Sequence, residues 1–253
     1  MVLEKYDIIN LIYYAKEIIK MNDELIPSFK KSLFDKSIDI STDLIELPID
    51  LITENEVIKE IPVVGTIVKL GNAAITIRER HLIKKLVVFI ESVNNGDVEQ
   101  DVLEKHKQML ETNPKKLSTE LESVLILVDR QLELEKTKIL SELYKAYIST
   151  KMGWEDFIYL SEILEKFFLR DVYELQLICE NKYAKEDSAV NKLSRFRLES
   201  IGLVEYFSRR ASSVAVLSGE RKQNQVKPTG YGKLIYECSL RKLINNDTIG
   251  VWF

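Results

Sequence analysis

Residues 188–207 read "SAVNKLSRFRLESIGLVEYF", and the periodicity of this stretch changes at one glycine. Before Gly202, the apolar pattern predicts a helix with Leu193, Phe196 and Leu198 facing inward. After Gly202, the run "LVEYF" is rich in β-branched and aromatic residues and predicts a strand. Glycine accepts the backbone geometry that ends a helix, so we expect the change of element at this residue.

The segment after this strand continues the alternation. The run "SVAVLS" (213–218) is a second β-prone segment and predicts the partner strand, and "GERKQNQVKP" (219–228) predicts a basic turn after it. Thr229 is then a candidate N-cap for a final helix that contains Leu234 and Leu240. The resulting order is helix, glycine, strand, hairpin, threonine, helix.

This order resembles winged helix-turn-helix domains, in which a helix ending in Gly-Leu-Val precedes a wing and a Thr-x-x-Gly motif. The resemblance covers about residues 157–242. In that family the helix enters the major groove of DNA and the wing touches the backbone. The resemblance therefore implies two groups of side chains that bind nucleic acid or another partner. They are Asn191, Lys192, Arg195 and Arg197 on the helix, and Arg209, Arg210, Arg221 and Lys222 beside the hairpin.

The charge distribution supports a separate C-terminal unit. Residues 1–181 hold 23 Lys and Arg against 33 Asp and Glu, whereas residues 182–242 hold 13 against 6. Cationic side chains supply most nonspecific affinity for nucleic acid, but a basic face can equally dock a protein. Both partners, DNA and protein, stay open. With Phe196 inward, Arg195 and Arg197 cannot share one face of the helix, so we expect one of them to reach the partner.

The composition predicts a mainly α protein. The chain of 253 residues is 45% hydrophobic and has nine glycines and five prolines, too few for a turn-dense all-β fold. We expect a multi-helix body followed by a winged helix-turn-helix-like α+β domain, divided as an acidic region 1–117, a helical linker or bundle 118–156 and a domain 157–253. No signal-peptide pattern begins the chain, so a cytoplasmic protein is expected. Homo-oligomer formation stays open.

The stretch "EIPVVGTIVKLGNAAITIRER" (60–80) raises the question of membrane insertion. Its pattern predicts a long central helix over about 62–94, and the apolar part is shorter than a bilayer core. A buried helix is therefore favoured, and membrane contact is the alternative. The candidate membrane contacts are the cations Lys69, Arg78, Arg80, Lys84 and Lys85.

No sequence motif indicates catalysis. The chain has no nucleophile elbow, zinc signature or dinucleotide fingerprint, so we expect no enzyme activity, no cofactor and no metal site. His81 and His106 lack metal-ligand spacing, and each is expected to be an ordinary surface or helix residue. Cys179 and Cys238 lie in apolar helical patterns and are expected to be buried thiols.

Three stretches carry a second resemblance: "IPVVGTIVKLGNAAITIRERHLIKKLVVFIESV", "LESVLILVDRQLELEKTKILSELYKAYIS" and "GWEDFIYLSEILEKFFLRDVYEL". They resemble a group of uncharacterised bacterial helical proteins with a winged-helix-like C-terminus, similar to the abortive-infection alpha type associated with phage resistance. The resemblance implies a non-catalytic defence protein that binds macromolecules. A DNA-binding regulator and a membrane-perturbing effector remain the alternatives.

Overall fold

The computed structural model describes residues 24–35, 42–70, 75–95, 98–182, 189–208 and 224–246. In these ranges the chain is mainly helical with one two-stranded sheet, which confirms the mainly α character predicted from composition. The winged helix-turn-helix-like domain stays a prediction. The chain divides into two compact units between Ser141 and Glu142. The division at 117 and 156 stays a prediction.

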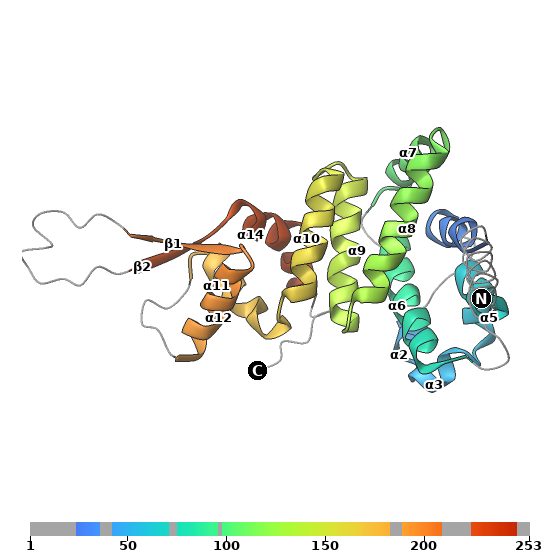
Figure 1. Cartoon of the computed structure of the whole chain (residues 1–253), viewed down its shortest axis with the longest axis horizontal. Coiled ribbons are helices and arrows are strands. Elements are labelled where there is room, and N and C mark those ends of the chain that lie inside the picture. The colour runs from blue at the N-terminus through green and yellow to red at the C-terminus, as the bar shows by residue number, and fades with distance from the viewer. Residues whose placement is uncertain are drawn as a thin grey trace, which may run out of the picture. The chain divides into compact units, whose positions relative to one another are not determined.

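The first unit consists of helices in the described ranges (Figure 1). A helix covers residues 24–34. The helices that follow it are α2 (Thr42–Glu46), α3 (Ile49–Ile52), α4 (Glu56–Glu60), α5 (Pro62–Leu70), α6 (Ile77–Asn94), α7 (Gln100–Glu111) and α8 (Pro114–Arg130). Helix α9 (Leu134–Ile148) begins in this unit and ends in the second.

Helix α6 forms the core of the first unit. Its residues from Ile83 to Ile90 are all buried, so side chains all around the helix are covered. The helix packs against α3, α5 and α8, and Figure 1 shows α6 and α8 side by side. On another side, the Phe89 ring lies 6.5 Å from the Phe29 ring between their centroids. A helix covered in this way holds its neighbours in one packed bundle.

The single helix predicted over 62–94 is wrong, because α5 ends at Leu70 and α6 begins at Ile77. Thr76 causes the new start. Its Oγ1 accepts a hydrogen bond from Glu79 N at 3.2 Å, and Glu79 Oε2 accepts one from Thr76 N at 2.6 Å. This reciprocal capping box satisfies two backbone donors that a helix start leaves open. Thr76 and Glu79 therefore start a second helix at Ile77.

The first helix of this stretch packs inside the unit. Val63 and Val64 are fully buried, and Ser32 Oγ accepts a hydrogen bond from Val63 N at 3.0 Å. Pro62 opens the helix where a missing N–H leaves no bond unmade. None of the helices in the described ranges combines the length and the apolar content that a bilayer crossing requires.

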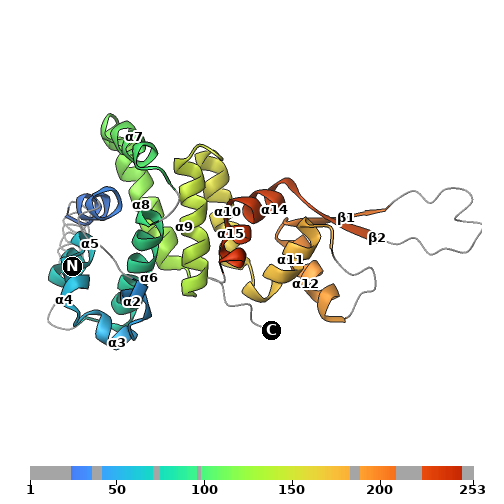
Figure 2. The ribbon, with the colours of Figure 1, turned by 180° about the vertical axis from the view of Figure 1, so that it is seen from behind.

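The second unit contains the end of α9 and the elements after it (Figure 2). They are α10 (Trp154–Lys166), the 3₁₀ turn η1 (Leu169–Asp171), α11 (Val172–Cys179), α12 (Ala189–Ser200), β1 (Val204–Ser208), β2 (Asn224–Pro228), α14 (Gly230–Ile235), the π-helical turn η2 (Tyr236–Leu240) and α15 (Arg241–Asn245). An aromatic cluster of Tyr144, Tyr147, Trp154 and Phe157 joins α9 to α10, with ring centroids 5.2 to 6.0 Å apart.

The sheet corrects one prediction. Strand β1 pairs antiparallel with β2, and Tyr206 lies opposite Val226. The segment 224–228 was expected to lie in a basic turn, whereas its backbone forms the partner strand and Val226 is buried. The predicted strand 213–218 lies outside the described residues. Strand β2 has one buried valine among polar neighbours, which is a weak strand signal. The run 213–218 is more apolar and was therefore predicted as the partner strand.

The junction between β1 and α14 is closely packed. Thr229 Oγ1 donates to Gly202 O at 2.7 Å and accepts from Gly232 N at 3.0 Å, so it caps α14 as predicted and joins it to the start of β1. A Cβ on Gly232 would lie 1.9 Å from Leu203 O, so only glycine fits there. Gly202 has φ of 78°, the left-handed conformation expected where α12 ends.

Candidate functional site

Helix α12 presents a different face from the predicted one. Leu198 is buried as expected, but Leu193 is 56% exposed and Phe196 is 69% exposed, so the predicted inward orientation of these two residues is wrong. Arg195 instead points inward and is only 3% exposed. The apolar pattern gave the wrong orientation of the helix because an arginine with a buried acidic partner can occupy a core position in place of an apolar residue.

The partner of Arg195 is Glu174 on the neighbouring helix α11. Arg195 Nε donates to Glu174 Oε1, and both side chains are buried. Two opposite charges brought out of water must pair closely to offset their desolvation. Arg195 therefore joins α12 to α11 inside the unit, and its guanidinium lies away from the surface.

Arg197 is also paired. Its Nε donates to Asp171 Oδ2 at 2.7 Å, its Nη2 donates to Asp171 Oδ1, and Asp171 is almost fully buried. The guanidinium also lies over the Phe168 ring, 5.4 Å from the centroid. The hydrogen bonds with Asp171 raise the pKa of Arg197 above its ordinary value. A guanidinium that donates two hydrogen bonds to one carboxylate has fewer N–H groups free to bind a phosphate or the edge of a base.

The other predicted binding residues of the C-terminal unit fall into two groups, those on α12 and those outside the described residues. Asn191 is half-buried on α12, and Lys192 is exposed on the same helix. Arg209, Arg210, Arg221 and Lys222 lie outside the described residues. On the described hairpin, Lys227 pairs with Glu205 at 3.1 Å and lies over the Phe207 ring. The cationic surface shown by the described part of α12 therefore consists mainly of Lys192.

Two of the five candidate membrane contacts are buried. Lys84 Nζ donates to the carbonyl oxygens of Ile45 and Leu47, and Lys85 Nζ donates to those of Asp129 and Gln131. Burial lowers the pKa of both ammonium groups. Consecutive lysines of α6 thus hold the C-terminal ends of α2 and α8, where backbone carbonyls lack helical partners. In this structure the two ammonium groups therefore face the interior of the first unit, and their contact with a membrane stays a prediction.

The other three candidates lie at the surface. Lys69 is exposed on α5. Arg78 Nη2 donates to Asp129 Oδ2 at 2.7 Å, and Arg80 Nη1 donates to Asp50 Oδ1 at 2.9 Å. Arg78 and Arg80 therefore form ion pairs within the first unit, the ordinary arrangement of cations on the surface of a helical bundle.

His106 is a helix residue, one of the two places expected for it, and it lies in the interior of α7 and not at the surface. It is buried, and its Nε2 lies 2.7 Å from Glu120 Oε1, which joins α7 to α8. His81 is exposed as expected. Within the described ranges, no three His, Cys, Asp or Glu side chains gather closely enough to hold a metal ion. His106 is thus a structural residue of the helical bundle.

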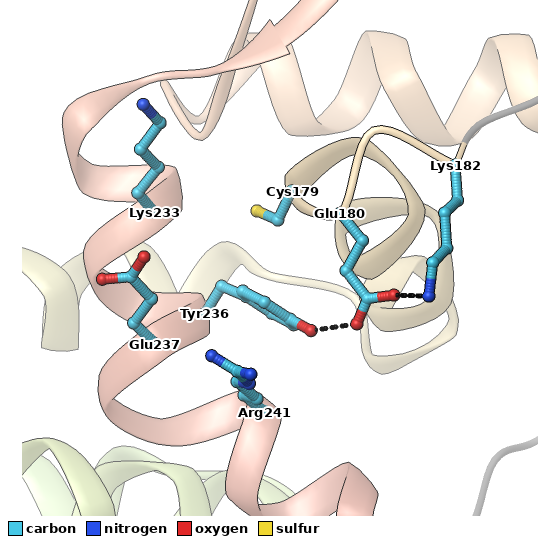
Figure 3. Close-up of a pocket in the computed structure, with 7 residues that line it drawn as sticks. All are labelled: Cys179, Glu180, Lys182, Lys233, Tyr236, Glu237 and Arg241. Atoms are coloured by element: carbon cyan, nitrogen blue, oxygen red, sulfur yellow. Dashed lines mark hydrogen bonds and ion pairs between the residues drawn. The ribbon is translucent and has the colours of Figure 1, made fainter.

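A pocket of about 500 Å³ opens between the end of α11 and the last helical run of the second unit (Figure 3). Figure 3 shows the Tyr236 phenol extending from this run toward Glu180, with the Cys179 thiol near it. The lining residues are Cys179, Glu180, Lys182, Lys233, Tyr236, Glu237 and Arg241. A pocket of this size can hold a small molecule.

Three lining groups have fixed protonation states near neutral pH. Burial raises the pKa of the Cys179 thiol to about 12, so the thiol stays protonated. Hydrogen bonds from Lys182 and Tyr236 lower the pKa of Glu180 to about 2, so this carboxylate stays ionised. Burial and the bond to Glu180 raise the pKa of Tyr236. Groups that titrate so far from neutrality are poor general acids and bases.

Sequence patterns did not identify this pocket. Its residues come from two segments more than fifty positions apart, and Lys233, Glu237 and Arg241 follow the spacing of an ordinary solvated helix surface. Cys179 and Cys238 are free thiols, as predicted, and they are half-buried instead of fully buried. Comparisons of the chain with protein-family models, with curated protein sequences and with solved structures found no match.

Proposed function

We propose that this chain is a non-catalytic protein-binding module and that its C-terminal unit docks a protein partner through the exposed face of α12. The observation that carries the proposal is the exchange of positions on this helix: Arg195 is buried and Phe196 is 69% exposed. Together with Leu193, one helical turn away, Phe196 gives α12 an apolar outer surface. Exposed aromatic and aliphatic side chains are typical of the centre of protein interfaces.

The pairing of the arginines supports this proposal against DNA reading by the same helix. A recognition helix presents unpaired polar and cationic side chains to base edges and phosphates. Here Arg195 is committed to Glu174 and Arg197 to Asp171. We propose a winged-helix-like fold for the unit, since α12, Gly202, β1, β2, Thr229 and α14 follow one another in that order. Such a fold can serve protein docking as well as DNA binding.

The proposal also covers the absence of a catalytic role and the biological setting. The protonation states in the pocket favour a binding role over catalysis. The biological setting that we propose is bacterial phage defence, and it rests on the resemblance of the three helical stretches to abortive-infection proteins. A DNA-binding regulator is the second candidate, because residues 182–242 hold 13 Lys and Arg against 6 Asp and Glu.

The test uses the full chain as bait in lysates of phage-infected and uninfected bacteria. Proteins recovered by the wild type are identified, purified and bound again in isolation to the wild type, to Phe196→Ser and to Lys192→Ser. We expect Phe196→Ser to weaken binding by roughly a factor of ten or more, the usual loss at an interface hot spot, and Lys192→Ser to retain it. Because Phe196 is exposed, its replacement leaves the core intact.

Two results would contradict the proposal. If purified partners bind Phe196→Ser as tightly as the wild type, α12 does not dock them. If no partner is recovered while the chain shifts DNA in a salt-dependent way, the regulator is the better function. A plaque assay with a strain that lacks the gene tests the defence setting separately, since unchanged plaque numbers would remove that part alone.

A further inference from the structure

The pocket presents three charged side chains from one helical run. Lys233, Glu237 and Arg241 are four residues apart, a spacing at which opposite charges on an α-helix commonly pair. All three side chains are exposed, and within the described residues none of them forms an ion pair or a side-chain hydrogen bond. They therefore remain available to a ligand.

The backbone explains part of this arrangement. The π-helical turn Tyr236–Leu240 lies between Lys233 and Arg241, and it widens the helix by one residue in that turn. Residues four apart across such a turn no longer lie directly above one another, so the usual pairing geometry is lost. Single π-turns inside helices occur often at functional sites.

On the opposite wall of the pocket, the charged groups already have hydrogen-bond and ion-pair partners. Glu180 accepts a hydrogen bond from the Tyr236 hydroxyl and lies 2.7 Å from Lys182 Nζ. This wall therefore contributes little free charge. The charges left for a ligand follow the order positive, negative, positive along the helical run, from Lys233 through Glu237 to Arg241.

We infer that this pocket binds a small zwitterion with two carboxylates and one amine, the chemistry of a dicarboxylic amino acid. Arg241 and Lys233 bind the two carboxylates, and Glu237 binds the ammonium group between them. A rise of about 1.5 Å per residue separates successive charges by roughly 6 Å along the axis, and Lys233 from Arg241 by roughly 12 Å. The two cations can therefore hold the carboxylates of one such molecule only by extending their long side chains toward Glu237. Glu237 repels a simple dianion, which gives the pocket its selectivity.

The experiment measures binding to the full chain by isothermal titration calorimetry. The probes are L-glutamate, succinate, which has the two carboxylates without the amine, and 1,4-diaminobutane, which has only amines. We expect saturable binding of L-glutamate, at least tenfold weaker binding of succinate and none of 1,4-diaminobutane. Arg241→Gln should weaken L-glutamate binding by about tenfold, the loss of one charge-assisted contact.

The variant Glu237→Gln gives the sharpest test. It removes the group that recognises the amine and repels a dianion, so L-glutamate should bind more weakly and succinate more tightly. Lys166→Gln is the matched control, since Lys166 is exposed on α10 and does not line the pocket. Thermal unfolding of each variant, followed by circular dichroism, shows whether it is folded.

Three outcomes would overturn the inference. They are no saturable heat with L-glutamate at millimolar concentration, equal affinity of the wild type for L-glutamate and succinate, and an equal loss in Lys166→Gln. The result is independent of the docking surface, because Phe196→Ser should bind L-glutamate as the wild type does. Failure here therefore leaves the proposed protein-binding function untouched.

Discussion

Arg195 Nε lies 2.5 Å from Glu174 Oε1, and this pair joins α12 to α11 in the interior of the second unit. Both side chains are at most 6% exposed, so neither charge has water to replace its partner. The pair sets the orientation of α12, because turning Arg195 inward turns Phe196 and Leu193 outward. The docking surface that we propose thus depends on a buried ion pair.

Replacing Arg195 by Met should destabilise the protein strongly. The variant leaves the Glu174 carboxylate buried without its partner, a change that costs about 3 to 5 kcal/mol in comparable pairs. Urea unfolding followed by circular dichroism measures the free energy of unfolding. The double variant Arg195→Met/Glu174→Leu should be more stable than Arg195→Met alone, since no unpaired charge remains. Lys192→Met, at an exposed position of α12, should change stability by less than about 0.5 kcal/mol.

Gly232→Ala should destabilise the junction between β1 and α14. A Cβ at this position would lie 1.9 Å from Leu203 O, so the backbone must shift, at a cost of about 3 kcal/mol or more. Gly230→Ala is the matched control, because a Cβ there would meet no atom within 4 Å. This control should be neutral or stabilising by up to about 1 kcal/mol. Equal thermal unfolding temperatures for the two variants would contradict the close approach.

Lys85→Met should destabilise the first unit by about 1 to 3 kcal/mol. The variant removes the donor to the carbonyl oxygens of Asp129 and Gln131, and a buried acceptor without a partner carries a penalty of this size. Lys69→Met is the control, since Lys69 is exposed on α5. Chemical unfolding of the two variants gives the comparison. If both lose the same stability, Lys85 does not hold the end of α8.

The sequence predicted the elements whose signals are local. Thr229 caps the last described helical run and Gly202 ends α12, because a cap and a left-handed turn depend on a few adjacent residues. The other features depend on contacts between residues that are far apart in the sequence. The buried positions of Arg195, Lys84 and Lys85 depend on acids or carbonyls far away in the sequence, which no periodicity reveals. The sequence Thr-x-x-Glu at Thr76 was a local signal for the second helix, and the surrounding apolar pattern obscured it.

The pocket wall gives a prediction for acid stability. Hydrogen bonds from Lys182 and Tyr236 lower the pKa of Glu180 from 4.5 to about 2. A carboxylate whose pKa is lower in the folded state contributes stability that is fully present above pH 4.5 and is lost as the pH falls toward about 2. Tyr236→Phe removes one donor, so the pKa of Glu180 should rise toward its ordinary value.

The difference in free energy of unfolding between the wild type and Tyr236→Phe should therefore be constant above about pH 5 and should shrink as the pH falls toward about 2. Urea unfolding at each pH measures this difference, and an NMR titration of the Glu180 carboxyl carbon follows its pKa directly. Tyr159→Phe is the control, because the Tyr159 ring packs against the Tyr231 ring at a tilt and does not line the pocket. A difference that does not change with pH would show that Tyr236 acts through packing alone, since only its bond to the ionised carboxylate links stability to proton binding.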